Sequence, residues 1–313
     1  MKARLVVVGL GRMGRLHAAN LAGRVAGAEL VGVVDAVSDV AREIGEEHGV
    51  AWSTSLDALD ADGVVIAAPT ALHADLVERA ARLGLHVFCE KPLGFEVGAA
   101  RRAVAAANGV ALQVGFQRRF DPDWVELAAR LRAGELGSLM VFRCSHRNAS
   151  EPHAGASLGD VFVDVAIHDL DAARWLGGEV AGVHAWERSG AACVSLRFES
   201  GALGLIDVVR RAAYGFECTA ELVGSRATAR AGAGARVELL RDGRASGAVA
   251  RDHAERHAAA YVGELHHFGE VIRGAEPRGA TGEDAVAALT LALLARRSAA
   301  IGAPVSVAEG VAA

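Results

Sequence analysis

The most constraining segment of this chain is a glycine-rich turn between an apolar run and a helical pattern, VVVGLGRMG at residues 6–14. A buried strand that reverses tightly into a helix needs a glycine at the turn, and Gly9 supplies it. Gly11 lets the backbone approach a pyrophosphate, and Gly14 lets the helix pack closely on the strand. The helix expected over residues 12–21 then directs its N-terminal N–H groups at an anion. This pattern predicts a parallel-sheet unit that binds a dinucleotide.

An acidic residue closes the next apolar run, GVVD, at Asp35. A carboxylate at this distance from the turn accepts hydrogen bonds from both ribose hydroxyls and repels a 2′-phosphate. A glycine-rich turn alone is weak evidence, and a plain loop without a ligand is the alternative. The conjunction of strand, turn, helix, second strand and acid is much more specific. It predicts an NAD cofactor in preference to NADP.

Composition excludes several other classes of protein. A length of 313 residues suits two domains, and a hydrophobic content of 52% suits a buried parallel sheet. A net charge of −5 offers no basic face to nucleic acid, and no stretch reaches the ~20 apolar residues of a membrane span. The sequence enters its first strand directly, which leaves no room for a signal peptide. The cysteines are widely spaced, without a CxxC pair, at Cys89, Cys144, Cys193 and Cys218. We therefore expect a cytoplasmic enzyme without a metal site or a disulfide framework.

Strand and helix patterns alternate over the first ~118 residues, which predicts a doubly wound parallel sheet of the α/β class. Strands are expected over residues 5–8, up to Asp35, and over 63–68, 86–90 and 111–116. Helices are expected over residues 12–21, 38–48, 73–83 and 96–107. We therefore expect an NAD-binding Rossmann domain over residues 1–118.

The rhythm changes beyond residue 120 and predicts a second, α+β domain over residues 119–313. A helix (122–133), a long strand (138–147) and a helix (164–176) come first. Five β runs follow at 180–188, 192–200, 201–209, 218–224 and 236–242, with a tight turn at 199–201, and helices over 255–273 and 283–300 end the chain. An open, largely antiparallel sheet with one covered face is expected. A second subunit could cover the other face.

Ligands of open α/β sheets bind at the carboxyl ends of the strands, and Lys91 is expected at such an end. It follows the apolar strand 86–90 in a chain whose only other lysine is Lys2. Pro92 keeps it out of the helical region. A cationic amine there can hold a substrate hydroxyl and polarise the carbonyl as it forms. An ordinary surface lysine is the alternative.

The preceding strand is followed by Ala68, Pro69 and Thr70, which we expect against the ribose and phosphate on the nicotinamide side. An ordinary strand exit is the alternative interpretation. His73 begins the next helix close to this loop.

Asp164 and His168 stand four residues apart and share one face of the expected helix. A neutral imidazole can accept a proton from an alcohol while a carboxylate supports the imidazolium that results. A surface ion pair is the alternative for this spacing. At the end of the long strand, His146 and Asn148 could also reach a site, and an amide such as Asn148 can both donate to and accept from hydroxyls.

These segments together resemble the Gfo/Idh/MocA oxidoreductases, and within them the inositol 2-dehydrogenases. The resemblance is carried by VVGLGRMG, EKP, GFQRRFDP, SHRN, DVAIHDLD and the late AAYVGELHHF. It covers nearly the whole chain. It implies a homo-oligomer, a dimer or a homotetramer, that assembles through the open sheet of the second domain.

The resemblance also implies roles for individual residues. Lys91, Asp164 and His168 would be catalytic, with His168 as the general base assisted by Asp164, and Lys91 orienting the oxygen. Hydride would pass to C4 of NAD. A polyol or sugar would be bound by Lys91, Asp164 and His168 together with Gln117, Arg118, Asn148 and Tyr214. The residues expected around NAD are Gly9, Gly11, Arg12, Met13, Gly14, Asp35, Ala68, Pro69, Thr70, His73, Glu90, Lys91 and Gln117.

The resulting hypothesis is an NAD-dependent dehydrogenase that oxidises a secondary hydroxyl of a cyclic polyol, myo-inositol, to 2-keto-myo-inositol (scyllo-inosose). An oxidoreductase of keto-sugars, inososes or aldoses with the same residues is one alternative. The other is a non-catalytic NAD(H)-binding regulator, against which the intact Lys91, Asp164 and His168 argue.

Overall fold

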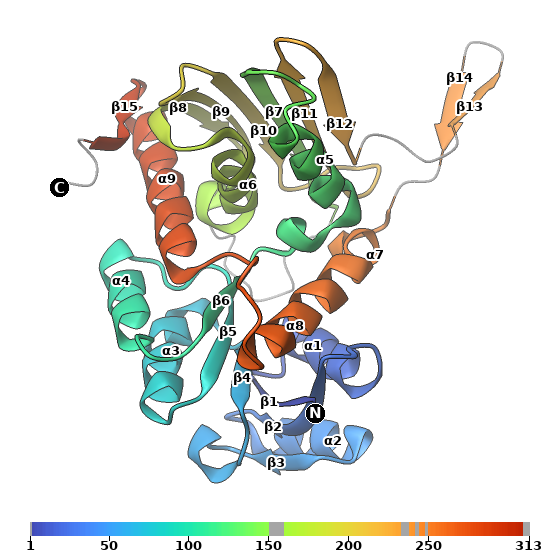
Figure 1. Cartoon of the computed structure of the whole chain (residues 1–313), viewed down its shortest axis with the longest axis vertical. Helices are drawn as coiled ribbons and strands as arrows, with labels where there is room; N and C mark the ends of the chain where they lie inside the picture. Colours follow the sequence, from blue (N-terminus) through green and yellow to red (C-terminus); the bar gives the residue numbers. More distant parts are fainter. Residues whose placement is uncertain (1, 150–159, 233–237, 242–243, 248–249, 309–313) are drawn as a thin grey trace. The chain divides into compact units, whose positions relative to one another are not determined.

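The structure is a computed structural model that describes residues 2–149, 160–232, 238–241, 244–247 and 250–308. The chain forms two compact units, whose elements are labelled in Figure 1. Unit 1 contains Met1–Phe120 and Ala259–Ala287, and unit 2 contains Asp121–Ala258 and Ala288–Ala313. The predicted domains, 1–118 and 119–313, stay a prediction. The two compact units have different bounds, because Ala259–Ala287 is grouped with the first part of the chain.

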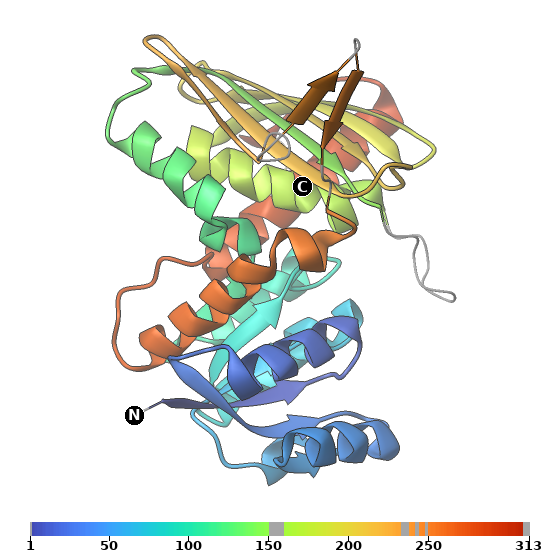
Figure 2. The same ribbon diagram turned by 90° about the vertical axis from the view of Figure 1, so that its right-hand side faces the viewer.

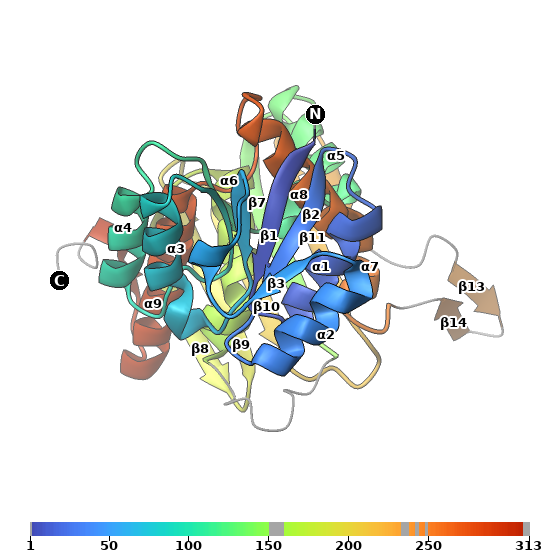
Figure 3. The same cartoon turned by 90° about the horizontal axis from the view of Figure 1, so that it is seen from below.

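Unit 1 is built on a six-stranded parallel sheet in the order β3-β2-β1-β4-β5-β6, which is the Rossmann order. Its strands are β1 (Ala3–Val8), β2 (Ala28–Val34), β3 (Ala51–Ser53), β4 (Gly63–Ile66), β5 (His86–Glu90) and β6 (Leu112–Gly115). Its helices are α1 (Arg12–Gly23), α2 (Ser38–His48), α3 (His73–Arg82), α4 (Val97–Ala106) and most of α8 (Ala258–Ile272). Helices α1 and α2 lie on one face of the sheet and α3 and α4 on the other (Figure 3). The predicted doubly wound sheet is confirmed, and β3 is a short addition that its sequence, AWS, did not indicate.

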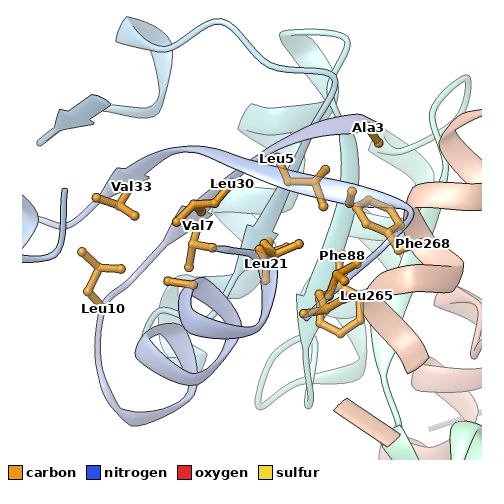
Figure 4. Close-up of a cluster of buried hydrophobic side chains, with 14 of the residues drawn as sticks. Ala3, Leu5, Val7, Leu10, Leu21, Leu30, Val33, Phe88, Leu265 and Phe268 are labelled. Atoms are coloured by element: carbon orange, nitrogen blue, oxygen red, sulfur yellow. The ribbon is translucent and has the colours of Figure 1, made fainter. Parts of the chain in front are cut away.

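The core of unit 1 explains why α8 belongs to it. Leu5 and Val7 of β1 point to the same face of the sheet. They are fully buried, because α1 and α8 cover this face. Leu265 and Phe268 of α8 join the same cluster (Figure 4). The ring of Phe268 meets the ring of Phe88 edge to face, with centroids 5.9 Å apart. This packing is long-range in sequence, so no local pattern could have assigned α8 to the first unit.

Unit 2 is built on a seven-stranded sheet in the order β12-β11-β7-β10-β9-β8-β15. Its strands are β7 (Leu139–Arg147), β8 (Val180–Arg188), β9 (Ala191–Phe198), β10 (Leu203–Val209), β11 (Glu217–Gly224), β12 (Thr228–Ala231) and β15 (Val305–Ser306). Only β7 and β10 pair in parallel, and the other neighbours are antiparallel. A largely antiparallel second sheet is therefore confirmed. The predicted turn at 199–201 joins β9 to β10, with Gly201 at φ 87°.

Helices α5 (Pro122–Arg132) and α6 (Ile167–Gly177) cover one face of this sheet (Figure 2). The part of α9 (Gly282–Ile301) that belongs to unit 2 is tied to β8, because the Ala185 N–H donates to Ser298 Oγ at 3.0 Å. A separate hairpin pairs β13 (Glu238–Arg241) with β14 (Arg244–Gly247). Residues 236, 237 and 242 of the strand predicted over 236–242 lie outside the described residues. Among the helices of the described ranges, none has the length and apolar character that a membrane crossing requires.

Two predicted helices differ from those observed. The helix expected over 164–176 begins with a π-helical segment, Phe162–Ala166, before α6. The helix expected over 255–273 is interrupted at His257, between α7 (His253–Arg256) and α8. His257 leaves the helical conformation at φ −108°, and its Nδ1 lies 2.9 Å from Asp121 Oδ2. This buried tertiary contact outweighs the local helix propensity of the segment.

Candidate active site

The glycine turn of unit 1 forms an anion cradle. Gly9 adopts φ +85°, and a Cβ atom there would lie 2.4 Å from the Ala68 Cα. A Cβ on Gly14 would lie 1.8 Å from the Gly9 carbonyl oxygen, so only glycine lets α1 approach β1 this closely. A Cβ on Gly11 would meet nothing within 4 Å, and Gly11 caps α1 without a side-chain hydrogen bond. The open space before the helix N-terminus fits a pyrophosphate.

The carboxylate of Asp35 is fixed beside this cradle, just after β2. Its Oδ2 accepts from the Leu10 N–H at 2.7 Å and its Oδ1 from the Val37 N–H at 2.9 Å. Each carboxylate oxygen can accept a further hydrogen bond, so both remain able to bind ribose hydroxyls. Arg12 is exposed and Met13 half-buried in the first turn of α1. These positions fit the adenosine and phosphate portions of a dinucleotide.

Two strand exits of unit 1 are joined by His73. Its Nδ1 lies 2.7 Å from the Pro92 carbonyl oxygen, and its Nε2 lies 2.7 Å from that of Ala68. His73 is 2% exposed, so both ring nitrogens are occupied by backbone rather than presented to a ligand. Pro69 is exposed and Thr70 half-buried beside it.

Lys91 is half-buried directly after β5, and Glu90 before it turns inward. Glu90 Oε1 lies 2.7 Å from His17 Nε2. Burial opposes the ionisation of Glu90, but the hydrogen bond from His17 and the nearby Lys91 and His73 keep its pKa below the usual value. Glu90 is therefore an internal anchor for the strand exit rather than a surface ligand. The strand β6 is followed by a short 3-10 turn, in which Gln117 and Arg118 are buried at 6% and 2% exposure.

In unit 2, Asp164 is held by an arginine. The Arg210 Nη1 lies 2.5 Å from Asp164 Oδ2, and Arg210 is buried at the end of β10 while Asp164 is exposed in the π-helical segment. A π turn contains more residues than an α turn. The simple i,i+4 geometry expected for Asp164 and His168 therefore does not apply. Asp164 has Arg210 as its charge partner, and His168 is half-buried in the first turn of α6.

A second polar group surrounds His146, near the end of β7. The rings of His146 and His168 lie with their centroids 6.4 Å apart. His146 Nδ1 is 3.2 Å from Asp169 Oδ2, and Cys144 Sγ is 2.9 Å from Asp169 Oδ1. Asp169 is fully buried, so these contacts offset the cost of burying its polar oxygens. His146 and His168 thus lie near one another in unit 2.

Asn148 and Tyr214 complete the predicted residues of unit 2. The Asn148 N–H donates to Val209 O at 2.9 Å, and Asn148 O accepts from the Ala212 N–H at 2.9 Å, which binds the end of β7 to the segment after β10. Tyr214 is 54% exposed and donates its hydroxyl to Glu217. Partial burial of the hydroxyl and this hydrogen bond raise the pKa of Tyr214 to about 12. Of the two, Asn148 is the more firmly positioned.

Sequence reasoning did not single out Arg210 and Asp169. Arg210 follows the run LIDVV, which is apolar except for Asp207, and a charged residue after such a run is the signal that identified Lys91. Asp169 carried no such signal, because its partners Cys144 and His146 lie on another strand.

A Rossmann sheet with an open helix N-terminus and an acid after β2 defines the class of NAD-binding oxidoreductases. Residues 3–116 match the oxidoreductase family with an NAD-binding Rossmann fold, GFO_IDH_MocA, and residues 124–230 match the C-terminal domain of the same family. The chain belongs to the Gfo/Idh/MocA family and is an NAD-dependent oxidoreductase.

Similar proteins span nearly the whole chain. The scyllo-inositol 2-dehydrogenase (NAD⁺) of Bacillus subtilis is 34% identical, covering 97% of this chain and 96% of its own. The myo-inositol 2-dehydrogenase of Thermotoga maritima is 32% identical, covering 94% and 96%. The crystal structure of the myo-inositol dehydrogenase of Lactobacillus casei in complex with NAD(H) and myo-inositol is 25% identical, with a TM-score of 0.87 over 98% of this chain and 97% of that one.

Replacing Gly14 with Ala should reduce the free energy of unfolding by about 3 kcal/mol, because a new Cβ would overlap the Gly9 carbonyl and overpack the α1–β1 contact. Urea denaturation followed by circular dichroism measures this. Gly98→Ala in α4 is the matched control, since its Cβ would meet nothing within 4 Å, and it should add about 0.5 kcal/mol through helix propensity. Equal stability of the two variants would contradict the close approach of α1 to the Gly9 carbonyl.

Changing Asp35 to Ser should raise the kcat/KM ratio of NADP to NAD on the order of tenfold, because charge-assisted hydrogen bonds to the ribose are lost and the repulsion of a 2′-phosphate is removed. Initial rates with each cofactor measure the ratio. Asp39→Ser, an exposed position paired with Arg42, serves as the control. An unchanged ratio in the Asp35 variant would mean that another group reads the ribose.

Proposed function

We propose that this chain oxidises a secondary hydroxyl of a cyclic polyol, myo-inositol, to 2-keto-myo-inositol, with His168 as the general base. The observation that carries the proposal is the half-buried His168, whose ring centroid lies 6.4 Å from that of His146, in a chain whose other unit binds NAD. The inositol dehydrogenases among the similar proteins support the substrate class.

The proposed reaction assigns one step to each residue. His168 accepts the hydroxyl proton as the carbon–oxygen bond becomes a carbonyl. Asp164 is paired with Arg210, and we assign to its carboxylate the stabilisation of the imidazolium that forms. The ammonium of Lys91 holds the oxygen that becomes the carbonyl.

The cradle and Asp35 fit NAD, because a Cβ on Gly11 would meet nothing within 4 Å and each Asp35 oxygen can accept a further hydrogen bond. Gly11 and the first turn of α1 would hold the pyrophosphate, and Asp35 the ribose hydroxyls. Bound NAD⁺ supplies the hydride acceptor. The loop Ala68–Pro69–Thr70 would lie against its nicotinamide side, and Gln117 would contribute from the turn after β6.

Polyol recognition is assigned to groups that can donate to and accept from several hydroxyls. Asn148 has an amide that does both, and the guanidinium of Arg118 donates. Gln117 adds a second amide, and Tyr214 a hydroxyl that stays protonated at neutral pH because its pKa is about 12.

We also propose that the chain forms a homo-oligomer, a dimer or tetramer, through the outer face of the unit 2 sheet. Trp186, Leu203 and Leu205 are exposed on β8 and β10 at 52%, 55% and 47%, and they alternate with the buried Ala185, Gly204 and Ile206. Apolar side chains gathered on one sheet face mark interaction surfaces. A cytoplasmic location stays a prediction.

A panel of inositols, inososes and aldoses, followed by NADH absorbance, tests the substrate class. We expect NADH to form with myo-inositol, and with other inositols more slowly. Reduction of a keto-sugar without oxidation of any polyol would favour the reductase alternative. NADH binding without turnover of any compound would favour a regulator.

Replacing His168 with Ala should lower kcat by about 10²–10³-fold, the usual contribution of a general base, while leaving NADH affinity unchanged. Steady-state kinetics and fluorescence titration with NADH measure the two effects. His48→Ala, at the end of α2, is the control and should keep the wild-type rate. A His168→Ala enzyme with nearly wild-type turnover would show that another group is the base.

A further inference from the structure

A polar cluster is buried inside unit 1 behind Lys91. It joins His17 of α1, Glu90 at the end of β5 and Glu264 of α8, which are 0%, 8% and 0% exposed. One nitrogen or oxygen atom from each lies within 4.8 Å of those of the other two. The cluster is surrounded by the aromatic rings of Phe88 and Tyr261, which lie 5.6 and 6.2 Å from the His17 ring.

Glu264 is the unusual member. Within the described residues, neither of its side-chain oxygens receives a hydrogen bond from a standard donor, although both are buried. Glu90 is already bonded to His17 at 2.7 Å. An ionised Glu264 without a donor, next to a second carboxylate, would carry a large desolvation and repulsion cost. A single proton on Glu264 removes both costs, and it turns Glu264 into a donor whose oxygen lies within 4.8 Å of the Glu90 carboxylate.

The distances favour a proton over a metal ion. His17 Nε2 and Glu90 Oε1 are separated by 2.7 Å, a hydrogen-bond distance. Two ligands of a tetrahedral zinc ion, each about 2.0–2.1 Å from the metal, would lie roughly 3.3 Å apart. The pair is therefore too close to hold such an ion between its atoms.

We propose that Glu264 is a positioning residue that holds a proton and donates it to Glu90. The Glu90 carboxylate is then fixed from two sides, by His17 and by Glu264. Since Glu90 directly precedes Lys91, this clamp fixes the backbone from which the Lys91 ammonium extends. The effect on catalysis rests on the proposed function, whereas the protonation of Glu264 does not depend on it.

The surroundings of Glu264 agree with a neutral acid. Burial and the Glu90 charge raise the pKa of Glu264 well above its usual value. Burial and the Glu90 charge raise the pKa of Tyr261, one turn earlier on α8, so it is neutral as well. On β6, Gln113 donates to the Glu264 carbonyl at 3.0 Å and supplies no charge.

The cationic side chains around this cluster lower the pKa of the neighbours of Glu264. Lys91 and His73 favour the ionised form of Glu90, and Arg12 and Arg118 act on Tyr261. The cationic groups thus support the charge of Glu90, which leaves the proton on Glu264.

Three variants test the proposal. Glu264→Gln keeps a donor toward Glu90 without a titratable proton, and Glu264→Leu removes the donor. Glu270→Gln, one and a half turns later on α8 and only partly buried, is the matched control. Infrared difference spectra at neutral pH should contain the C=O band of a protonated carboxylic acid in the wild type and in Glu270→Gln, and lack it in Glu264→Gln. The absence of this band in the wild type, or one equivalent of tightly bound metal by elemental analysis, overturns the proposal.

Kinetics separate positioning from packing. The loss of one buried donor should lower kcat about tenfold in Glu264→Leu with little change in the KM for NAD, and Glu264→Gln should recover most of this loss. The wild-type rate should fall as pH rises through the raised pKa of Glu264, and this fall should be absent in Glu264→Gln. Identical kinetics for the Gln and Leu variants overturn the positioning role. If no polyol is turned over, the proposed function fails, and the infrared spectrum still shows whether Glu264 is protonated.

Stability gives an independent readout. Because the pKa of Glu264 is raised on folding, its contribution is fully present below the unfolded pKa and is lost as pH rises toward the folded pKa. Thermal unfolding should therefore show a Tm that falls less steeply with pH in Glu264→Gln than in the wild type, whereas parallel curves overturn the proposal.

Discussion

The close approach of α1 to β1 is the constraint on which unit 1 depends. Gly14 faces the Gly9 carbonyl at a distance that no side chain permits, so the helix starts directly behind the turn. This places the open N-terminus of α1 where an anion can bind, and it brings His17, one turn further along, into contact with Glu90. The same packing thus sets both the cofactor cradle and the internal anchor of the strand exit before Lys91.

Much of unit 1 was predictable because its determinants are local. The helix at residues 38–48 and the strand at 86–90 were predicted with the bounds that the structure shows. Their apolar periodicity and the flanking turn residues carry the information. The short β3 escaped prediction, because three residues are too few to show a period.

Long-range contacts account for what the sequence did not reveal. The break at His257 depends on Asp121, and the clustering of α8 with the first part of the chain depends on Phe88 and Phe268. Arg210 and Asp164 lie 46 positions apart and meet only because β10 ends beside the π-helical segment. The roles assigned to Lys91, Asp164 and His168 stay predictions, and the structure adds the partners that would make those roles possible.

His73 has a mechanical consequence for the whole site region of unit 1. Its ring nitrogens lie 2.7 Å from the carbonyl oxygens of Ala68 and Pro92, so two separate loops pack against one buried imidazole. One loop is expected beside the cofactor and the other carries the turn after Lys91. A shift of either loop would therefore be transmitted to the other through one imidazole ring, so that cofactor binding and the orientation of the lysine are not independent variables.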